Sequence, residues 1–330
     1  MARVLSGIQP SGDPHLGNYI GAMRHWVADQ ERDDCFFFIV DLHALTTQGD
    51  PHELRADTID LAAWLLAVGL TPERSTLWVQ SHVHEHAELA WILQCFTAFG
   101  ELNRMTQFKE RREQQDFISA GLFTYPALQA ADILLYSIDR VPVGEDQRQH
   151  LELTRDVAAR FNQRFGETFV LPDPAIPSVG GRVMNLQEPG EKMSKSTGAP
   201  SGTINLADPP DVVSRKVRSA VTDSGRDILA REDKPAISNL LEIHSAMSGR
   251  AIPELEQAYA GMGYGAYKQD LAELLVERLD PLRRRHEELM GDPAELSRLL
   301  EVGAERAQAI ASKTLGTVYE RVGLLPRGRG

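Results

Sequence analysis

One uninterrupted apolar run, Cys35-Phe36-Phe37-Phe38-Ile39-Val40, limits the fold of this chain more than any other segment. It has the length of a strand and is apolar at every position, so we expect both faces of that strand to be buried. Shorter β-rich runs lie on either side of it in the sequence, at Val4-Leu5 and Leu77-Trp78-Val79. Between the second and third runs, Asp50-Pro51 and Gly69 are of the types that start and stop a helix. Strands that alternate with helices in this way predict a parallel sheet with crossover helices.

The alternation of strands and helices ends after two more predicted strands, and only helices follow. Val141-Pro142-Val143-Gly144 and Arg182-Val183-Met184 are predicted to form two further strands. After Pro209-Pro210 the sequence shows helical periodicity only, in segments from residue 211 onward and at residues 237–247, 252–259, 267–279 and 294–318. We therefore predict an α/β domain over residues 1–200 and an all-helical domain over residues 201–330.

The net charge of −12 argues against a protein that coats nucleic acid nonspecifically, because such binding needs many lysine and arginine contacts with phosphate. A nucleic-acid partner can then be bound only through local patches, such as Arg215-Lys216-Val217-Arg218 and Arg283-Arg284-Arg285. The simpler interpretation of each run is a solvated helix face.

The sequence predicts a protein of the cytoplasm. No apolar run approaches the roughly 20 residues that a membrane-spanning helix needs, and the first residues lack the apolar core of a secretory signal. The chain has 2 cysteines, too few for a disulfide framework or a four-thiolate zinc site, which is consistent with a reducing compartment.

A turn rich in glycine and proline follows the first predicted strand and leads into a helix, in the sequence Gly7-Ile8-Gln9-Pro10-Ser11-Gly12-Asp13-Pro14-His15-Leu16-Gly17-Asn18. The start of a helix offers unpaired N–H groups and the positive end of the helix dipole to an anion. Gly17 lets a ligand approach the backbone closely, and His15 and Asn18 can donate hydrogen bonds to phosphate oxygens. Taken alone, the segment is as well explained by a turn without a ligand.

A second candidate phosphate site lies at Gly190-Glu191-Lys192-Met193-Ser194-Lys195-Ser196-Thr197-Gly198. Its two lysines stand among hydroxyl side chains, and the flanking glycines allow the loop to move. Two ammonium groups there can neutralise a triphosphate as pyrophosphate leaves, which lowers the barrier most if they act in the transition state. A phosphate role is favoured over a solvated surface loop, and the two segments together indicate an enzyme that uses ATP.

These two segments resemble the HIGH and KMSKS motifs of class I aminoacyl-tRNA synthetases. Residues 192–196 match the second motif completely, whereas His15-Leu16-Gly17-Asn18 matches the first in part, with Asn18 in place of a second histidine. Asparagine remains a donor but cannot become cationic. The resemblance narrows to the tryptophan-specific members of the family at residues 7–12, 105–109, 125–136 and 141–147, and it covers almost the whole chain.

The resemblance implies a Rossmann-like catalytic domain and a reaction in two steps. The tryptophan carboxylate attacks the α-phosphate of ATP, and the adenylate then passes its aminoacyl group to the 3′ end of tRNA(Trp). By matched position, the implied catalytic residues are His15, Asn18, Lys192 and Lys195. The implied ATP contacts are Gln9, Pro10, Ser11, Gly17 and Asn18 in the first motif, Gly144, Glu145 and Asp146 around the ribose, Val183 at the adenine, and Lys192, Met193, Ser194, Lys195 and Ser196 at the triphosphate. Mg²⁺ is implied as part of the ATP complex, held mainly by phosphates and water, without a metal site made by the protein.

Tryptophan contacts are implied at Asp132, which accepts the indole N–H, and at Tyr125 and Gln147, which hold the ammonium. A carboxylate in an apolar pocket accepts hydrogen bonds only, so phenylalanine would leave it unpaired, and sites of this kind discriminate by roughly 10⁴-fold. The alternative for Asp132 is an exposed position on a helix. Gln129 completes a spacing that also occurs in tyrosine-specific relatives, and tyrosine brings a donor too. A tyrosine-specific enzyme is therefore the nearest alternative function.

Two other functions stay open at this stage. A nucleotidyltransferase that shares only the first motif is disfavoured by the complete second motif and the helical half. A synthetase-like RNA-binding protein without catalysis is disfavoured because the implied catalytic residues are intact. The resemblance also implies a homodimer with an interface around residues 82–140, and a helical domain that engages the anticodon region of tRNA.

Two further groups of residues resemble a metal site and a nucleobase-stacking surface, but a structural role explains each more simply. His82 and His86 have the i, i+4 spacing of a metal site, but we predict a helix start with exposed imidazoles. The aromatic residues Phe36, Phe37, Phe38, Trp64 and Trp91 are predicted to lie in the core rather than to stack on nucleobases.

Overall fold

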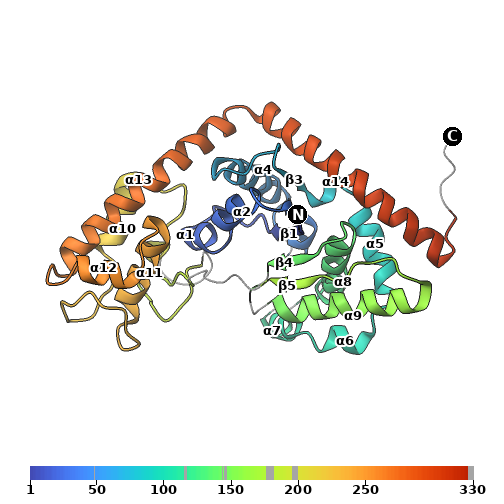
Figure 1. The fold of residues 1–330 in the computed structure, drawn as a ribbon, viewed down its shortest axis with the longest axis horizontal. Helices are drawn as coiled ribbons and strands as arrows, with labels where there is room; N and C mark the ends of the chain where they lie inside the picture. Colours follow the sequence, from blue (N-terminus) through green and yellow to red (C-terminus); the bar gives the residue numbers. More distant parts are fainter. Residues whose placement is uncertain are drawn as a thin grey trace.

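A five-stranded parallel sheet in the order β3-β2-β1-β4-β5 forms the centre of the α/β part (Figure 1). The structure is a computed structural model that describes residues 1–47, 49–114, 117–142, 144, 147–175, 182–194 and 200–325, the last residues of one helix, 111–114, by backbone only. Four of the five strands predicted from the sequence belong to this sheet, as β1 to β4. The strands are β1 (Arg3–Ile8), β2 (Asp34–Ile39), β3 (Ser75–Val79), β4 (Arg140–Pro142) and β5 (Asp173–Ala175).

Helices flank the sheet and then continue alone after residue 209, as the sequence predicted. Those of the α/β part are α1 (Leu16–Asn18), a π-helical turn (Tyr19–Met23), α2 (Arg24–Asp29), α3 (Asp41–Ala44), α4 (Pro51–Ala67), α5 (Glu85–Gln94), α6 (Phe99–Asn103), α7 (Thr106–Gln114), α8 (Ala120–Leu134) and α9 (Arg148–Phe165). The later ones are α10 (Pro210–Arg218), α11 (Pro235–Ser248), α12 (Ile252–Ala258), α13 (Tyr264–Met290) and α14 (Pro293–Val322). Short 3₁₀ turns occur at Leu45–Thr47, Gln80–His82 and Pro200–Gly202. Among the helices described, none is long and apolar enough to cross a membrane.

Strand β2 is buried on both faces, which confirms the prediction from its unbroken apolar run. Cys35, Phe37 and Ile39 belong to one hydrophobic cluster, with side chains of α2, α4 and α13. The alternate residues Phe36 and Phe38 belong to a second cluster, with side chains of α5, α8, α9 and α14. The period of two along a strand therefore divides a single run between the two cores that lie above and below the sheet.

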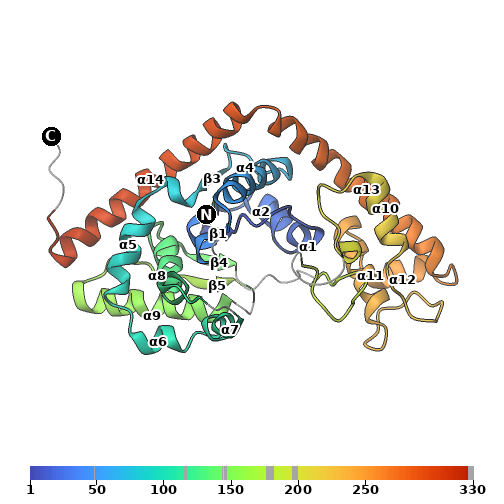
Figure 2. The ribbon, with the colours of Figure 1, turned by 180° about the vertical axis from the view of Figure 1, so that it is seen from behind.

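The two longest helices return the chain from the helical part to the sheet. In Figures 1 and 2, α13 rises from the helical part and α14 descends along the far side of the α/β part. Helix α14 crosses the edge strand β3 at Gly303, where a Cβ atom would lie only 1.8 Å from the carbonyl oxygen of Leu77. Glycine thus lets the helix cover an edge that would otherwise offer unpaired backbone groups. The predicted domain boundary at residue 200 stays a prediction. Residues after it contribute side chains to both hydrophobic clusters.

Two predictions about local structure are wrong. Met184 does not belong to a sheet strand: it forms an isolated antiparallel bridge with Lys192, and its N–H and C=O groups bond to the side chain of Asn239. The fifth strand is Asp173–Ala175 instead. Trp91 is 68% exposed on α5, whereas Phe36, Phe37, Phe38 and Trp64 are buried as predicted. Helical spacing next to alanine and leucine did not reveal that Trp91 points away from the core.

Candidate active site

The loop after β1 lies at a point where the sheet changes direction. From β1 the chain crosses to β2 on one side, and β4, on the other side of β1, continues to β5. Ligands of open α/β sheets bind in the crevice that such a switch leaves beyond the carboxyl ends of the strands. Gln9, Pro10 and Ser11 follow β1, and Gly144 follows β4, so these predicted ATP contacts share that edge. Glu145 and Asp146, also predicted there, lie outside the described residues.

His15 and Asn18 cap the helix start reciprocally. The backbone N–H of His15 donates to Asn18 Oδ1 at 3.0 Å, and the N–H of Asn18 donates to His15 Nδ1 at 3.3 Å. These bonds use the acceptor atoms of both side chains. The remaining nitrogens, Nε2 of a neutral His15 and Nδ2 of Asn18, are N–H donors. Both nitrogens are therefore of the donor type that a phosphate oxygen requires.

The structure brings the first motif against the beginning of the second. Gly17 has no side chain at a point where a Cβ would lie 2.9 Å from the His15 ring and 3.8 Å from Cβ of Met193. Met193 is 1% exposed and belongs to the same core cluster as Leu16. A larger residue at position 17 would displace the His15 ring, so this glycine is required by close packing.

The chain that follows the second motif pairs with the first. Leu16 N–H donates to the carbonyl of Ile204 at 2.8 Å, and Leu206 N–H donates to that of Pro14 at 2.8 Å. The hydroxyl of Thr203 donates to the carbonyl of Ser194 at 2.9 Å. The segment 203–206 thus fixes both motifs at one place. Lys195 and Ser196, which were predicted to contact the triphosphate, lie outside the described residues, while Lys192 is exposed.

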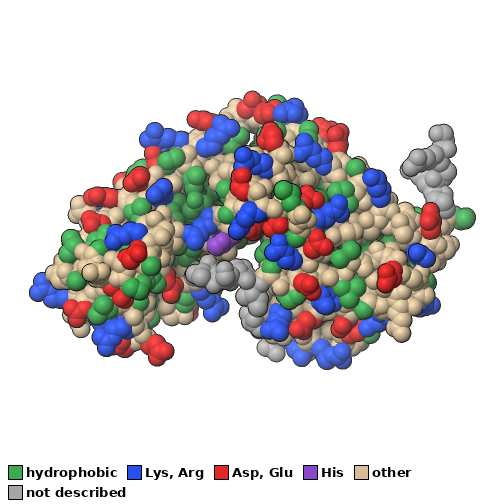
Figure 3. All heavy atoms as spheres, in the orientation of Figure 1, with side chains coloured by type: hydrophobic (Ala, Val, Ile, Leu, Met, Phe, Trp, Pro, Cys, Tyr) green, Lys and Arg blue, Asp and Glu red, His purple; other side chains and the backbone are tan. Residues whose placement is uncertain are grey.

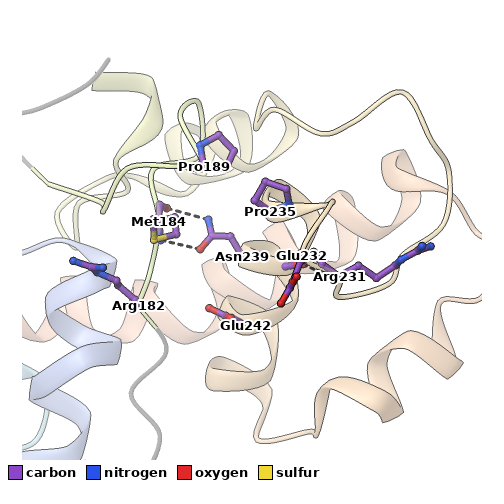
Figure 4. A pocket seen from close by; sticks show the side chains of 9 residues that line it. Arg182, Met184, Pro189, Arg231, Glu232, Pro235, Asn239 and Glu242 are labelled. Atoms are coloured by element: carbon purple, nitrogen blue, oxygen red, sulfur yellow. Dashed lines mark hydrogen bonds between the residues drawn. The ribbon is translucent and has the colours of Figure 1, made fainter.

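Asn239 of α11 holds the strand-like segment that contains Val183. Its Oδ1 accepts from Met184 N–H at 2.8 Å, and its Nδ2 donates to the carbonyl of Met184 at 3.0 Å, which replaces a neighbouring strand. Figure 4 shows this pair beside a shallow surface pocket lined by Arg182, Met184, Pro189, Arg231, Glu232, Pro235, Ser238, Asn239 and Glu242. On its other side, Met193 N–H donates to the carbonyl of Val183 at 2.9 Å. The predicted adenine contact is therefore tied to the second motif.

The carboxylate of Asp132, on α8, is 2% exposed and surrounded by N–H donors, so the alternative of an exposed helix position is wrong. Gln80 Nε2 and His86 Nδ1 lie 2.7 and 2.6 Å from Oδ1, and His43 Nε2 lies 2.8 Å from Oδ2. Burial acts to raise the pKa of this carboxyl, but the hydrogen bonds from His43 and His86 and the attraction to these rings lower the pKa to about 2. Asp132 is thus ionised at neutral pH.

The other residues predicted to contact the amino acid lie on the same helix or next to it. Tyr125 is two turns before Asp132 on α8, and its ring meets that of His43 edge-on at 6.2 Å. Its hydroxyl lies 2.6 Å from His150 Nε2 and 3.0 Å from Gln107 Oε1. Gln129 Nε2 donates to Gln147 Oε1 at 3.4 Å. Tyr125, Gln129, Asp132 and Gln147 are therefore brought together.

Sequence reasoning missed several polar residues of this cluster and misplaced one. His43 and Gln80 directly follow the regions of β2 and β3, so their position at the carboxyl ends of predicted parallel strands could have indicated them. His86 was predicted to be exposed but has 0% exposure, because its ring is bonded to Asp132, while His82 is exposed. Across the described ranges, no group of three or more His, Cys, Asp or Glu side chains is arranged to hold a metal ion.

The two basic runs are largely neutralised by acidic neighbours. Lys216 pairs with Asp208 at 2.6 Å, and Arg283 and Arg284 both pair with Asp280 at 2.7 Å. Figure 3 shows basic and acidic side chains mixed over the visible face, which is hollowed between the helical and the α/β parts. The simpler interpretation of a solvated helix face does not hold for Lys216 and Arg283, because their side chains are only 13% and 21% exposed.

Comparison with known proteins gives consistent matches over the whole chain. A family model described as class I tRNA synthetases (W and Y) matches residues 1–280. A curated relative, tryptophan–tRNA ligase 2 of Streptomyces avermitilis, is 57% identical over 98% of this chain and 97% of its own length.

Two solved structures have the same architecture. Tryptophanyl-tRNA synthetase from Mycoplasma pneumoniae superimposes with a TM-score of 0.90 at 38% identity, covering 98% of both chains. The enzyme from Campylobacter jejuni, complexed with ADP and tryptophan, gives a TM-score of 0.85 at 38% identity and covers 98% of this chain and 100% of that one. The predicted family and fold class are thereby confirmed.

Proposed function

The chain belongs to the class I tRNA synthetases of the tryptophan and tyrosine group, and from this membership we propose how its residues carry out the reaction. The activity is that of a tryptophan–tRNA ligase, as in its relative of 57% identity. A carboxylate oxygen of tryptophan attacks the α-phosphorus of ATP, and the bond from that phosphorus to the bridging oxygen breaks to release pyrophosphate. A hydroxyl at the 3′ end of tRNA(Trp) then displaces AMP from the adenylate.

The proposed ATP site extends from the β1 loop to the second motif. Gln9, Pro10, Ser11, Gly17 and Asn18 contact ATP, His15 lies near its phosphates, Gly144, Glu145 and Asp146 surround the ribose, and Val183 contacts the adenine. Lys192, Met193, Ser194, Lys195 and Ser196 hold the triphosphate. The direct packing of Gly17 against Met193 supports this assignment, because one nucleotide can then reach both motifs. Mg²⁺ enters with ATP, since phosphate oxygens and water are its usual ligands in such sites.

Asp132 is the observation that carries the amino-acid assignment. A buried, ionised carboxylate at the carboxyl edge of the sheet can accept a hydrogen bond and cannot donate one. The indole N–H of tryptophan supplies a donor on an otherwise apolar ring. Tyr125 and Gln147 hold the substrate ammonium in this proposal, with Gln129 beside Gln147.

The function is tested by ATP–pyrophosphate exchange with the purified chain. We expect exchange with tryptophan, and kcat/KM for phenylalanine lower by roughly 10⁴-fold, the range for sites that require a hydrogen-bond partner. Faster exchange with tyrosine than with tryptophan would favour the tyrosine-specific alternative. No exchange with any amino acid would rule out synthetase activity and leave the nucleotidyltransferase and the non-catalytic RNA-binding protein as alternatives.

Dimerisation through residues 82–140 is part of the proposal, as are a cytoplasmic location and tRNA anticodon binding by residues 201–330. Exposed apolar side chains in this segment support the interface: Trp91 is 68%, Phe99 72% and Phe117 63% exposed. Phe99 of α6 packs against Phe123 of α8 at 5.0 Å, which gives the patch a firm base. Large aromatic side chains are the residues most often responsible for interface affinity.

Trp91→Glu is expected to raise the dimer dissociation constant at least about tenfold, because a carboxylate would replace an apolar anchor. Sedimentation equilibrium over a range of concentrations measures this. Met262→Glu is the matched control, because Met262 is 50% exposed on the helical part and should leave the constant unchanged. A monomeric unmodified chain, or equal effects of both changes, would contradict the proposed interface.

A further inference from the structure

The two carboxylate oxygens of Asp132 accept different numbers of hydrogen bonds from the protein. Oδ1 receives two donors, Gln80 Nε2 and His86 Nδ1, whereas Oδ2 receives one, His43 Nε2. A carboxylate oxygen accepts two hydrogen bonds along its lone pairs. Within the described part of the chain, Oδ2 is therefore the oxygen with capacity for a further donor.

The bond from His86 to Oδ1 is set by a second buried residue. An ionised carboxylate only accepts, so His86 carries a proton on Nδ1 and donates it to Oδ1. The hydroxyl of Tyr136 lies 2.8 Å from Nε2 of the same ring, at hydrogen-bond distance. Burial, together with the negative charges of Asp132 and Glu85, raises the pKa of Tyr136 well above its ordinary value, so the hydroxyl keeps its proton.

Aromatic packing holds both rings in place. The His86 ring stacks on Phe38 at 5.7 Å and on Trp78 at 6.2 Å, and Tyr136 stacks on Phe36 at 5.5 Å. His86 and Tyr136 both have 0% exposure. Because β2 and β3 supply these aromatic side chains, the sheet holds in place the series of hydrogen-bonded side chains Tyr136, His86 and Asp132.

We propose that Tyr136 and His86 are positioning residues for the choice of tryptophan: they fix Oδ1 of Asp132, so that Oδ2 is directed to the indole N–H. This inference rests on the proposed contact between Asp132 and the indole. Selectivity for a substrate with an N–H donor then depends on all three hydrogen-bonded side chains, Tyr136, His86 and Asp132, rather than on Asp132 alone. Groups held in a fixed orientation lose less free energy when they bind a ligand.

Selectivity for the N–H group provides a measurement that a purely structural role would not change. Tryptophan is compared with β-(benzothiophen-3-yl)alanine, which has a sulfur atom in place of the indole N–H. Tyr136→Phe removes one hydroxyl and keeps the ring that packs on Phe36. We expect the ratio of kcat/KM for tryptophan to that for the analogue, measured by ATP–pyrophosphate exchange, to fall about tenfold, the effect of one misdirected buried hydrogen bond.

Tyr267→Phe is the matched control. Tyr267 also has 0% exposure, and its hydroxyl has no hydrogen-bond partner among the described residues, so we expect the ratio to stay unchanged. Equal losses of kcat/KM for both substrates in Tyr136→Phe would overturn the inference. An unmodified chain that does not discriminate between the substrates would overturn the proposed contact between Asp132 and the indole. Failure of the positioning role is thus distinguished from failure of that contact.

His86 gives a second comparison that does not depend on how well Tyr136→Phe folds. His86→Asn keeps an N–H donor near the place of Nδ1, whereas His86→Leu removes it. We expect His86→Asn to keep at least about threefold more of the selectivity ratio than His86→Leu, since part of one hydrogen bond is restored. Equal ratios in the two variants would contradict a positioning role for His86.

Discussion

Asp132→Asn is expected to lower kcat/KM for tryptophan by about 10²- to 10³-fold, the effect of breaking a buried charged interaction on one side. If the asparagine oxygen stays with Gln80 and His86, its NH₂ group takes the place of Oδ2. A donor would then face both His43 Nε2 and the indole N–H. Histidine can move its proton to the other nitrogen and accept from this donor, but the indole cannot. The substrate therefore loses its hydrogen bond.

The measurement is ATP–pyrophosphate exchange with tryptophan and with the benzothiophene analogue. The analogue has no N–H to oppose the new donor, so its kcat/KM should fall by less than tenfold, whereas the KM for ATP should stay within about twofold because the proposed ATP contacts lie elsewhere. A loss for tryptophan smaller than tenfold, or equal losses for both amino acids, would show that Asp132 does not accept the indole N–H.

Acid dependence of stability gives an independent check on the same side chain. The pKa of Asp132 is about 2 in the fold, below the ordinary value of about 3.9. A lowered pKa means that the ionised carboxylate stabilises the fold above about pH 4, and that this contribution is lost as the pH falls toward about 2. The difference in free energy of unfolding between the unmodified chain and Asp132→Asn should therefore shrink over that interval, as followed by urea unfolding.

Periodicity predicted the fold because the burial of each strand depends on its own residues. The run from Cys35 to Val40 is apolar on both faces and lies between two cores. Arg182-Val183-Met184 was also predicted to be a strand, yet Met184 pairs with the side chain of Asn239, which is 55 residues away in sequence. The return of α14 to the sheet likewise depends on Gly303, whose contact with Leu77 is not visible in the helical pattern.

The site was predicted as separate motifs, whereas its connections depend on tertiary structure. His15, Asn18 and Lys192 were indicated by their motifs, and Asp132 was implied by the family resemblance. His86 was predicted to be exposed because its neighbours are those of a polar helix start, and the partner that buries it, Asp132, is 46 residues away. Tyr136 ends a segment that carries the family resemblance, but nothing in the sequence indicated its contact with His86. Polar residues that act on other polar residues leave no periodic pattern, so the donors around Asp132 emerged only from the structure.

Lys195→Ala is expected to lower the rate of tryptophan activation by about 10²- to 10³-fold, the usual loss when one group that stabilises transition-state charge is removed. Lys195 lies outside the described residues, but the chain just before it is fixed: Met193 is 1% exposed, and the carbonyl of Ser194 accepts a hydrogen bond from Thr203. The described beginning of the second motif therefore lies beside Gly17 and His15, where the proposed role of Lys195 is to neutralise the leaving pyrophosphate.

The proposed role predicts a difference between two measurements on this variant. Single-turnover formation of the adenylate should show the full loss, whereas the Kd for tryptophan without ATP should change by less than about twofold, because Lys195 acts on charge that develops only as the phosphorus–oxygen bond breaks. Lys313→Ala, at an exposed position on α14, controls for the loss of a positive charge and should leave both values unchanged. Equal losses in rate and in tryptophan affinity would mean that Lys195 stabilises the bound substrate as much as the transition state, and its place in the second motif would then reflect binding alone.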